Sequence, residues 1–254
     1  MAQLQALIFD VDGTLADTEC EGHRVAFNRA FNEYGLSWNW SVELYGTLLA
    51  VGGGKERMKY FLETHHPSIP PSFSVEDIPA LHLLKNKYYE EILLNGEIPL
   101  RPGVIRLFNE AQAQGIRMAI ATTSSLTNTL ALLKYHLGSE AESLFEVIGA
   151  GDVVPNKKPA PDIYQYVLEK LGVPPESCVV FEDSEAGVKA SCHAHLATVM
   201  TINTYTESHS SKGAALVVDH LGDPNNLCKA IAGNIEGFQG QVDLEVCQKI
   251  LNVN

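Results

Sequence analysis

The sequence predicts an α/β protein in which a doubly wound parallel sheet is interrupted, after its first strand, by an inserted helical segment. Three observations support this fold class. Residues 6–9 form a short continuous apolar run, which is typical of a strand buried on both faces of a parallel sheet. Similar runs alternate with helical patterns from residue 97 onward, as in successive βαβ units. Between Phe9 and Met118 the pattern is predominantly helical, with no run of this kind.

Composition and charge restrict the class of protein. The chain has 254 residues and a formal net charge of −13, which argues against nucleic acid and anionic membranes as partners. No apolar run approaches the ~20 residues of a membrane span. The five cysteines are scattered without a C-x-x-C pair, which favours a reducing compartment over a zinc site or a disulfide framework.

The first strand begins within a few residues of Met1, so we expect no signal peptide. We therefore expect a soluble, monomeric and intracellular protein. It would be cytoplasmic in a bacterium, or in the chloroplast stroma if a transit peptide has been removed.

Two aspartates directly follow the first strand. Asp10 and Asp12 stand two residues apart, so an extended backbone turns both side chains to one side at the carboxyl end of the strand. Open α/β sheets bind their ligands at that edge. Because two such acids repel each other, their proximity indicates a bound cation and a nucleophilic aspartate. Alone, the same residues would also fit a calcium loop or a simple turn, and the later strand ends favour the catalytic interpretation.

We interpret residues 17–96 as a helical domain inserted into an α/β core of residues 1–16 and 97–254. The apolar spacing in this segment predicts helices over Thr18–Tyr34, Val42–Leu49, Lys55–Thr64 and Ile78–Leu94.

Two pairs of polar residues in these helices have helical spacing. Glu19 and His23 lie four residues apart, at the end of the first helix nearest the aspartates. An ordinary surface ion pair would explain them, but their position favours contact with the substrate. His82 and Lys85 form a weaker pair, which a solvated helix face would explain nearly as well.

A glycine run followed by two cations is the most informative part of the inserted segment. Gly52, Gly53 and Gly54 would expose backbone N–H groups ahead of a helix, and Lys55 and Arg57 follow. The run does not match a Walker A motif. A flexible loop before a charged helix is the alternative to an anion site.

Strands and helices alternate in the remainder of the chain. Helices are predicted over Pro102–Gly115, Leu126–Leu137 and Asp162–Leu171. Strands are predicted over Met118–Ala121, Phe145–Ile148, Cys178–Phe181, Leu196–Ile202 and Ala214–Val218. The tail beyond Pro224 contains no identifiable chemistry.

Polar residues follow several of these strands. They are the hydroxyls of Thr122, Thr123 and Ser124, the ammonium of Lys158 on a loop fixed by two prolines, and the carboxylates of Glu182 and Asp183. Hydroxyls at a helix start bind phosphate, although they also serve as ordinary N-caps. A pair of acids at a strand end is usually a helix cap. Helix capping alone does not explain why carboxylates follow the first strand, hydroxyls follow a second strand, and carboxylates again follow a later one.

The chain resembles the haloacid dehalogenase (HAD) superfamily of phosphotransferases over nearly its whole length. Four motifs occur in the same order: Asp10-Val-Asp12-Gly-Thr14, Thr122, Lys158-Pro159 and Glu182-Asp183. The resemblance implies a Rossmann-like core and an inserted helical cap of the C1 type.

The resemblance also implies a mechanism. Asp10 would attack phosphorus to give an aspartyl phosphate, and Asp12 would protonate the leaving oxygen and later activate water. Thr122 and Lys158 would bind the transferring phosphoryl oxygens. The implied metal is Mg²⁺, held by Asp10, the Asp12 carbonyl and Asp183 with support from Glu182.

The inserted segment is similar to the cap of the CbbY-type phosphatases. This resemblance rests on Glu19, His23, the run Ala26-Phe27-Asn28, Trp38-x-Trp40, Gly53-Gly54-Lys55-Glu56-Arg57 and His82-x-x-Lys85. Members of that group hydrolyse xylulose-1,5-bisphosphate, an inhibitor of the Calvin-cycle enzyme Rubisco, to xylulose 5-phosphate. The implied partner is thus a small phosphorylated sugar. The expected substrate-binding residues are Glu19, His23, Gly52, Gly53, Gly54, Lys55, Arg57, His82, Lys85, Thr123 and Ser124.

Two other functions remain open. A sugar phosphomutase that resembles β-phosphoglucomutase would have the same Asp10 and Asp12, so these residues do not separate it from a phosphatase. A non-enzymatic sugar-phosphate binding protein is disfavoured, because every catalytic position is occupied.

Overall fold

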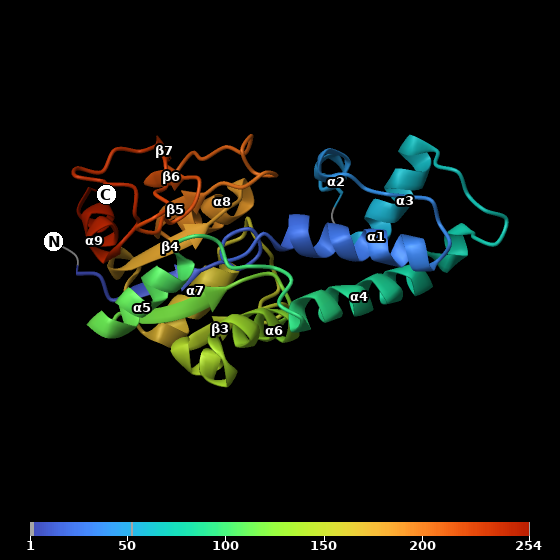
Figure 1. The fold of residues 1–254 in the computed structure, drawn as a ribbon. Coiled ribbons are helices and arrows are strands. Elements are labelled where there is room, and N and C mark those ends of the chain that lie inside the picture. The colour runs from blue at the N-terminus through green and yellow to red at the C-terminus, as the bar shows by residue number, and fades with distance from the viewer. Residues whose placement is uncertain (1–2, 52, 254) are drawn as a thin grey trace. The chain divides into compact units, whose positions relative to one another are not determined.

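The structure is a computed structural model that describes residues 3–51 and 53–253. Figure 1 shows its ribbon. The chain divides into two compact units: an α/β unit formed by Met1–Asp17 and Pro99–Asn254, and a helical unit formed by Thr18–Ile98. The assignment of the helical unit as a cap stays a prediction.

Within the described residues, seven strands form one sheet in the α/β unit, in the order β3-β2-β1-β4-β5-β6-β7 (Figure 1). Their bounds are Ala6–Phe9 (β1), Arg117–Ala121 (β2), Val147–Gly149 (β3), Cys178–Glu182 (β4), Ala197–Thr201 (β5), Leu216–Val218 (β6) and Ala230–Ala232 (β7). The pairs are parallel except that β7 runs antiparallel to β6 at one edge. The central strand is β1, in which Ile8 lies opposite Ala119 and Val180. The predicted α/β class with a parallel sheet is confirmed.

Helices cover both faces of this sheet because its central strand is apolar on both. Ile8 belongs to a buried cluster with residues of α7 (Asp162–Leu171) and α8 (Glu185–His193). Successive strand residues alternate between faces, so Phe9 faces the other side. There its ring stacks on Phe181 with centroids 4.7 Å apart and meets Phe108 of α5 (Val104–Gln114) at 5.0 Å. The sheet is therefore doubly wound.

Three strands are shorter than their apolar runs suggest. The strand β3 begins at Val147 and not at Phe145, because the Phe145 N–H closes a turn onto the Glu142 carbonyl at 3.2 Å. The strand β6 begins two residues later than predicted, because the Ala214 N–H bonds to the Ser211 carbonyl at 2.9 Å. The strand β5 covers residues 197–201 and not 196–202.

The tail forms part of the α/β unit. Both β7 and α9 (Leu244–Val253) follow Pro224, in a segment to which the sequence analysis assigned no element. The helix α9 buries Cys247 and Ile250. Arg106 of α5 donates to the carbonyls of Leu221 and Val242 at 3.0 and 2.9 Å, which attaches the tail to the unit.

The helical unit has an aromatic core of its own. It contains α1 (Arg24–Glu33), α2 (Val42–Leu48), α3 (Gly54–His65) and α4 (Ile78–Leu94), and its first helix begins as a π-helical turn at Thr18–His23. Trp40 is fully buried and packs against Phe27, Phe31 and Phe61, with centroids 4.6, 4.9 and 5.4 Å away. No helix in the described parts of the chain has the length and hydrophobicity needed to cross a membrane.

Candidate active site

Asp10 lies directly after β1 at the centre of the sheet. Its N–H donates to the Phe181 carbonyl at 3.0 Å, so the pairing of β1 with β4 continues through it. The side chain is buried, and both of its oxygens have partners. Oδ2 accepts a hydrogen bond from the Thr14 hydroxyl at 3.2 Å, and Oδ1 lies 2.7 Å from the Lys158 Nζ. The carboxylate is thus held at the carboxyl edge of the sheet, while Asp12 lies half-buried in the loop that follows.

Lys158 comes from the loop between β3 and α7 and reaches acids at the ends of β1 and β4. Its Nζ lies 2.7 Å from Asp10 Oδ1, 2.5 Å from Glu182 Oε1 and 2.9 Å from the Ala121 carbonyl. These acceptors use the three donors of the ammonium group. Burial alone would lower the pKa of Lys158, but the Asp10 and Glu182 carboxylates outweigh burial and raise the pKa above its ordinary value. Lys158 is therefore a permanent cation.

Three carboxylates gather at these strand ends. Oxygen atoms of Asp10, Glu182 and Asp183 lie within 4.8 Å of one another, and all three residues are buried. Burial raises the pKa of Glu182 and of Asp183, and the Asp10 and Glu182 charges raise that of Asp183 further. Lys158 offsets only one of three potential negative charges. A divalent cation would relieve the rest, and Mg²⁺ prefers such oxygen donors, so the residues present fit the ion that the sequence predicts.

The hydroxyls after β2 separate into different roles. Thr122 is buried, its N–H donates to the Gly149 carbonyl at 2.9 Å, and its Oγ1 accepts from the Ser124 N–H at 3.1 Å. Thr123 is exposed. The N-cap of α6 (Leu126–Leu137) is Ser125, whose hydroxyl oxygen accepts from the Asn128 N–H at 3.2 Å. Capping therefore does not require the Thr122 hydroxyl, which can donate to a phosphoryl oxygen.

His23 and Lys85 are the centre of a polar cluster in the helical unit. The Lys85 Nζ lies 2.7 Å from His23 Nδ1. Because an ammonium group only donates, Nδ1 is the acceptor and the imidazole proton is on Nε2. Burial, followed by the charges of Lys85, Arg57 and His82, lowers the pKa of His23 well below its ordinary value. His23 is therefore neutral beside a buried lysine.

Tyr45 connects Glu19 to Arg57 in the same unit. The buried Tyr45 hydroxyl donates to Glu19 Oε2 at 2.6 Å and accepts from Arg57 Nη1 at 2.7 Å. Arg57 also donates through Nε to the Val51 carbonyl at 3.4 Å. Sequence spacing paired Glu19 with His23, whereas the structure places Glu19 against Tyr45, which the sequence analysis did not single out.

The glycine run before α3 is only partly described, since Gly52 lies outside the described residues. Gly53 has a φ of +87°, a conformation that favours glycine. Gly54 packs against His82, and a Cβ atom there would lie 2.5 Å from the His82 Nε2. Lys55 is exposed, in contrast to the buried arginine two residues later.

Comparisons with known proteins identify the family. The family model of the haloacid dehalogenase-like hydrolases matches residues 4–194. The chain belongs to the haloacid dehalogenase-like hydrolases. This hydrolase is 46% identical over 222 residues to the plasmid-encoded protein CbbY of Cupriavidus necator. The aligned residues cover 87% of each chain. It is 32% identical over 189 residues to a phosphorylated carbohydrates phosphatase of Thermotoga maritima, covering 74% of this chain and 80% of the other.

A solved structure extends the likeness of this hydrolase to CbbY proteins. A variant of CbbY from Rhodobacter sphaeroides, crystallised in complex with xylulose-1,5-bisphosphate, matches with a TM-score of 0.71 and 43% identity. The match covers 86% of this chain and 95% of that one. The resemblance to the superfamily and to its CbbY group is confirmed.

Residues outside the four motifs also support the candidate active site of this hydrolase. The buried Tyr164 hydroxyl on α7 donates to Glu182 Oε1, and the Tyr164 ring centroid lies 5.2 Å from the Lys158 Nζ. Gly187 on α8 leaves space for Glu182, because a Cβ atom at Gly187 would overlap the Glu182 carboxyl group. The sequence analysis identified neither residue. Tyr164 has the spacing of a core residue on its helix, and no local signal marks it as a partner of Glu182.

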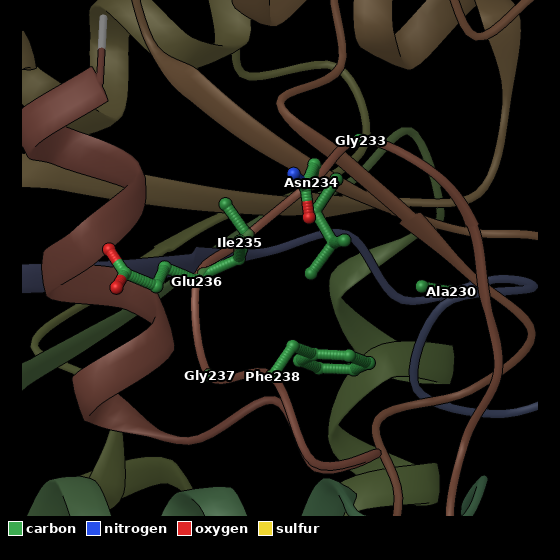
Figure 2. Close-up of a pocket in the computed structure, with 8 residues that line it drawn as sticks. Ala230, Gly233, Asn234, Ile235, Glu236, Gly237 and Phe238 are labelled. Carbon is green, nitrogen blue, oxygen red and sulfur yellow. The ribbon is translucent and has the colours of Figure 1, made fainter.

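A pocket of about 630 Å³ lies elsewhere in the α/β unit of this hydrolase, against β6 and the edge strand β7 (Figure 2). Most of its lining comes from residues 233–238, and the Glu236 carboxylate extends away from the Phe238 ring. None of the described residues that line it is basic. This pocket therefore lacks the charge that a phosphate ester requires, in contrast to the strand ends around Asp10.

Proposed function

We propose that this phosphatase hydrolyses a sugar bisphosphate, xylulose-1,5-bisphosphate, to xylulose 5-phosphate and inorganic phosphate. The observation that supports this substrate class is the buried cationic cluster of the helical unit, in a chain whose net charge is −13. A monophosphate needs one anion site, which the strand ends around Lys158 would supply. A bisphosphate needs a second anion site for its other phosphate group. The crystallised complex of the Rhodobacter sphaeroides relative with xylulose-1,5-bisphosphate favours the same substrate.

The proposed mechanism uses the residues at the strand ends. The Asp10 carboxylate attacks phosphorus, the bond to the sugar oxygen breaks, and Asp12 protonates that oxygen. Asp12 then takes a proton from the water that hydrolyses the aspartyl phosphate. Bound by Asp10, Asp183 and the Asp12 carbonyl, Mg²⁺ would reduce the repulsion between nucleophile and phosphate.

Lys158 and Thr122 would stabilise the phosphoryl group during this transfer. The Lys158 Nζ already bonds to Asp10 Oδ1. The Asp10 side chain loses its carboxylate charge once it is phosphorylated. A phosphoryl oxygen would then take the place of this acceptor. Glu182, whose Oε1 also accepts from the Tyr164 hydroxyl, would keep the ammonium in position through the step.

Arg57 and Lys85 are the proposed ligands of the second phosphate. Both are buried cations, and the neutral His23, whose pKa burial and both of these charges lower, can donate from Nε2. Arginine binds phosphate through two parallel N–H groups, which suits this role. Tyr45 would hold the guanidinium in place by accepting from Nη1 at 2.7 Å.

The test measures phosphate release with Mg²⁺ from xylulose-1,5-bisphosphate, ribulose-1,5-bisphosphate, xylulose 5-phosphate and para-nitrophenyl phosphate. We expect kcat/KM to be highest for xylulose-1,5-bisphosphate. Isomerisation of β-glucose 1-phosphate without net release of phosphate would establish a phosphomutase instead. The Asp10→Asn variant should remain folded and release no phosphate, because the amide preserves the size of the side chain but is not a nucleophile.

A matched pair of variants tests the second anion site. Arg57→Met removes the buried guanidinium, and Lys55→Met removes an exposed cation two residues away. Hydrogen bonds to a charged group are worth about 1.5–3 kcal/mol, so Arg57→Met should raise the KM for the bisphosphate roughly 10- to 100-fold. Its turnover of para-nitrophenyl phosphate, which has no second phosphate, should change little. Equal effects of the two variants would refute the assignment of Arg57.

A further inference from the structure

Gly13 is the point where the loop after β1 meets Asp183. Its φ of +84° is a conformation that favours glycine, and a Cβ atom there would overlap the Asp183 carboxylate. The Gly13 carbonyl accepts two hydrogen bonds, one from Arg101 Nη1 at 2.5 Å and one from Asn203 Nδ2 at 3.3 Å. Neither donor belongs to the four motifs that predicted the active site.

Asn203, just after β5, is held rigidly and bonds to Asp183. Its backbone N–H donates to the Thr206 hydroxyl at 2.9 Å, and its Oδ1 accepts from the Tyr205 N–H at 2.9 Å. With Oδ1 engaged as an acceptor, Nδ2 must face the other way, where it donates to Asp183 Oδ2 at 2.8 Å. The Asn203 amide therefore determines the rotation of the Asp183 carboxylate. The other carboxylate oxygen, Asp183 Oδ1, is directed away from Asn203.

Arg101 ties together the loops after three strands. Its buried guanidinium donates to the carbonyls of Gly13, Thr201 and Ile202 at 2.5, 3.1 and 2.5 Å. It also donates to the Asp219 carbonyl at 2.6 Å. These acceptors follow or end β1, β5 and β6. The planar fork of an arginine can reach all of them at once, whereas a lysine ammonium has three donors on a single atom.

We propose that Arg101 and Asn203 are positioning residues that form the metal site before the metal binds. Asn203 sets the rotation of the Asp183 carboxylate, and Arg101 fixes the backbone at Gly13, next to the Asp12 carbonyl. The proposal rests on the Mg²⁺ site of the proposed function, but not on the identity of the sugar. Groups that orient metal ligands typically change metal affinity or activity 10- to 100-fold when they are removed.

The test measures Mg²⁺ binding to the metal-free protein by titration calorimetry, with no substrate present. Asn203→Ala should weaken Mg²⁺ binding about 10- to 100-fold, while Asn109→Ala, on the exposed side of α5, should match the wild type. Arg101→Lys keeps the charge but loses the fork, and it should also weaken binding. If Asn203→Ala does not fold, Asn203→Ser, which keeps a small polar side chain beside Thr206, replaces it.

Kinetics provide a second readout with para-nitrophenyl phosphate as the probe. Asn203→Ala should need about 10- to 100-fold more Mg²⁺ for half-maximal activity yet approach the wild-type kcat at saturating Mg²⁺. Wild-type Mg²⁺ affinity in both Asn203→Ala and Arg101→Lys would overturn the proposal. A wild type that binds no Mg²⁺ would overturn it together with the metal site. If Mg²⁺ binding responds as expected but xylulose-1,5-bisphosphate is not hydrolysed, only the proposed substrate fails.

Discussion

Replacing Lys158 by Met tests whether this cation holds the acidic cluster together. Its ammonium lies 2.7 Å from Asp10 and 2.5 Å from Glu182, and the side chains of all three residues are less than a tenth exposed. Methionine has a similar length and fits an apolar environment, but it leaves both carboxylates without their cation. With Asp183 nearby, three acids would then face one another in the interior.

The expected loss of stability is large. Removing one partner of a buried ion pair costs about 3–5 kcal/mol, because the remaining charge is neither solvated nor paired. For a chain of this size each kcal/mol shifts the unfolding midpoint by about 2–4 °C, so Lys158→Met should unfold roughly 6–20 °C below the wild type. Burial raises the pKa of Glu182 and Asp183, so both acids take up protons more readily than usual. The deficit should therefore shrink as the pH is lowered.

The adjacent lysine is the matched control. Lys157 pairs at 2.8 Å with Asp152, whose side chain is 99% exposed, and such surface pairs contribute about 0–1 kcal/mol. Thermal unfolding of both variants would be followed by circular dichroism in metal-free buffer. If Lys157→Met and Lys158→Met unfold at the same temperature, Lys158 does not neutralise the cluster, and the electrostatic account of the site is wrong.

Two further changes have effects that the structure predicts. In the folded protein, burial and the charges of Lys85, Arg57 and His82 hold the pKa of His23 below 6.5. Just below pH 6.5, the His23 imidazole therefore takes up a proton in the unfolded chain but not in the folded protein. Stability should thus be lost as the pH falls below 6.5, by up to about 1.4 kcal/mol per pH unit, until the folded pKa is reached, and His23→Asn should reduce this slope. Gly187→Ala would push against the Glu182 carboxyl, so it should cost about 1–3 kcal/mol and lower phosphate release, although alanine normally favours a helix.

Urea unfolding at a series of pH values, followed by tryptophan fluorescence, measures the first effect. Both tryptophans, Trp38 and Trp40, lie in the helical unit with His23. His66→Asn, at an exposed position of the same unit, is the control and should keep the wild-type slope. For the second effect, Lys189→Ala on the exposed side of α8 is the control, and equal stability of the two α8 variants would contradict the packing argument.

The strand-end motifs could be predicted from the sequence because each depends on local features. A short apolar run predicts a buried strand, and the carboxyl ends of parallel strands lie at the same edge of the sheet. Asp10, Thr122 and Asp183 therefore had to lie near one another once the sheet order was known. Lys158, on its proline-rich loop, also reaches this edge, which the local sequence alone does not require.

Tyr164 and Asn203 could not be predicted in this way. Their roles arise from contacts between segments distant in the chain: the bond from Asn203 to Gly13 spans 190 residues. In the sequence, an asparagine after a strand indicates only a turn, and a tyrosine on an apolar helix face indicates only core packing. Likewise, the early part of the predicted strand at Phe145 was lost to a turn that local hydrophobicity does not reveal.

The insertion point of the helical unit affects the order in which the chain can fold. Residues 18–98 are contiguous, so this unit can complete its aromatic core while the later chain is still being synthesised. The strand β1 can pair with its neighbours only after they are synthesised, because Ala6 pairs with Arg117 and Cys178. An antiparallel bridge between Ala16 and Leu100 joins the two ends of the insertion. The helical unit is therefore a module that recombination could replace with another, while β1 still pairs with β2 and β4.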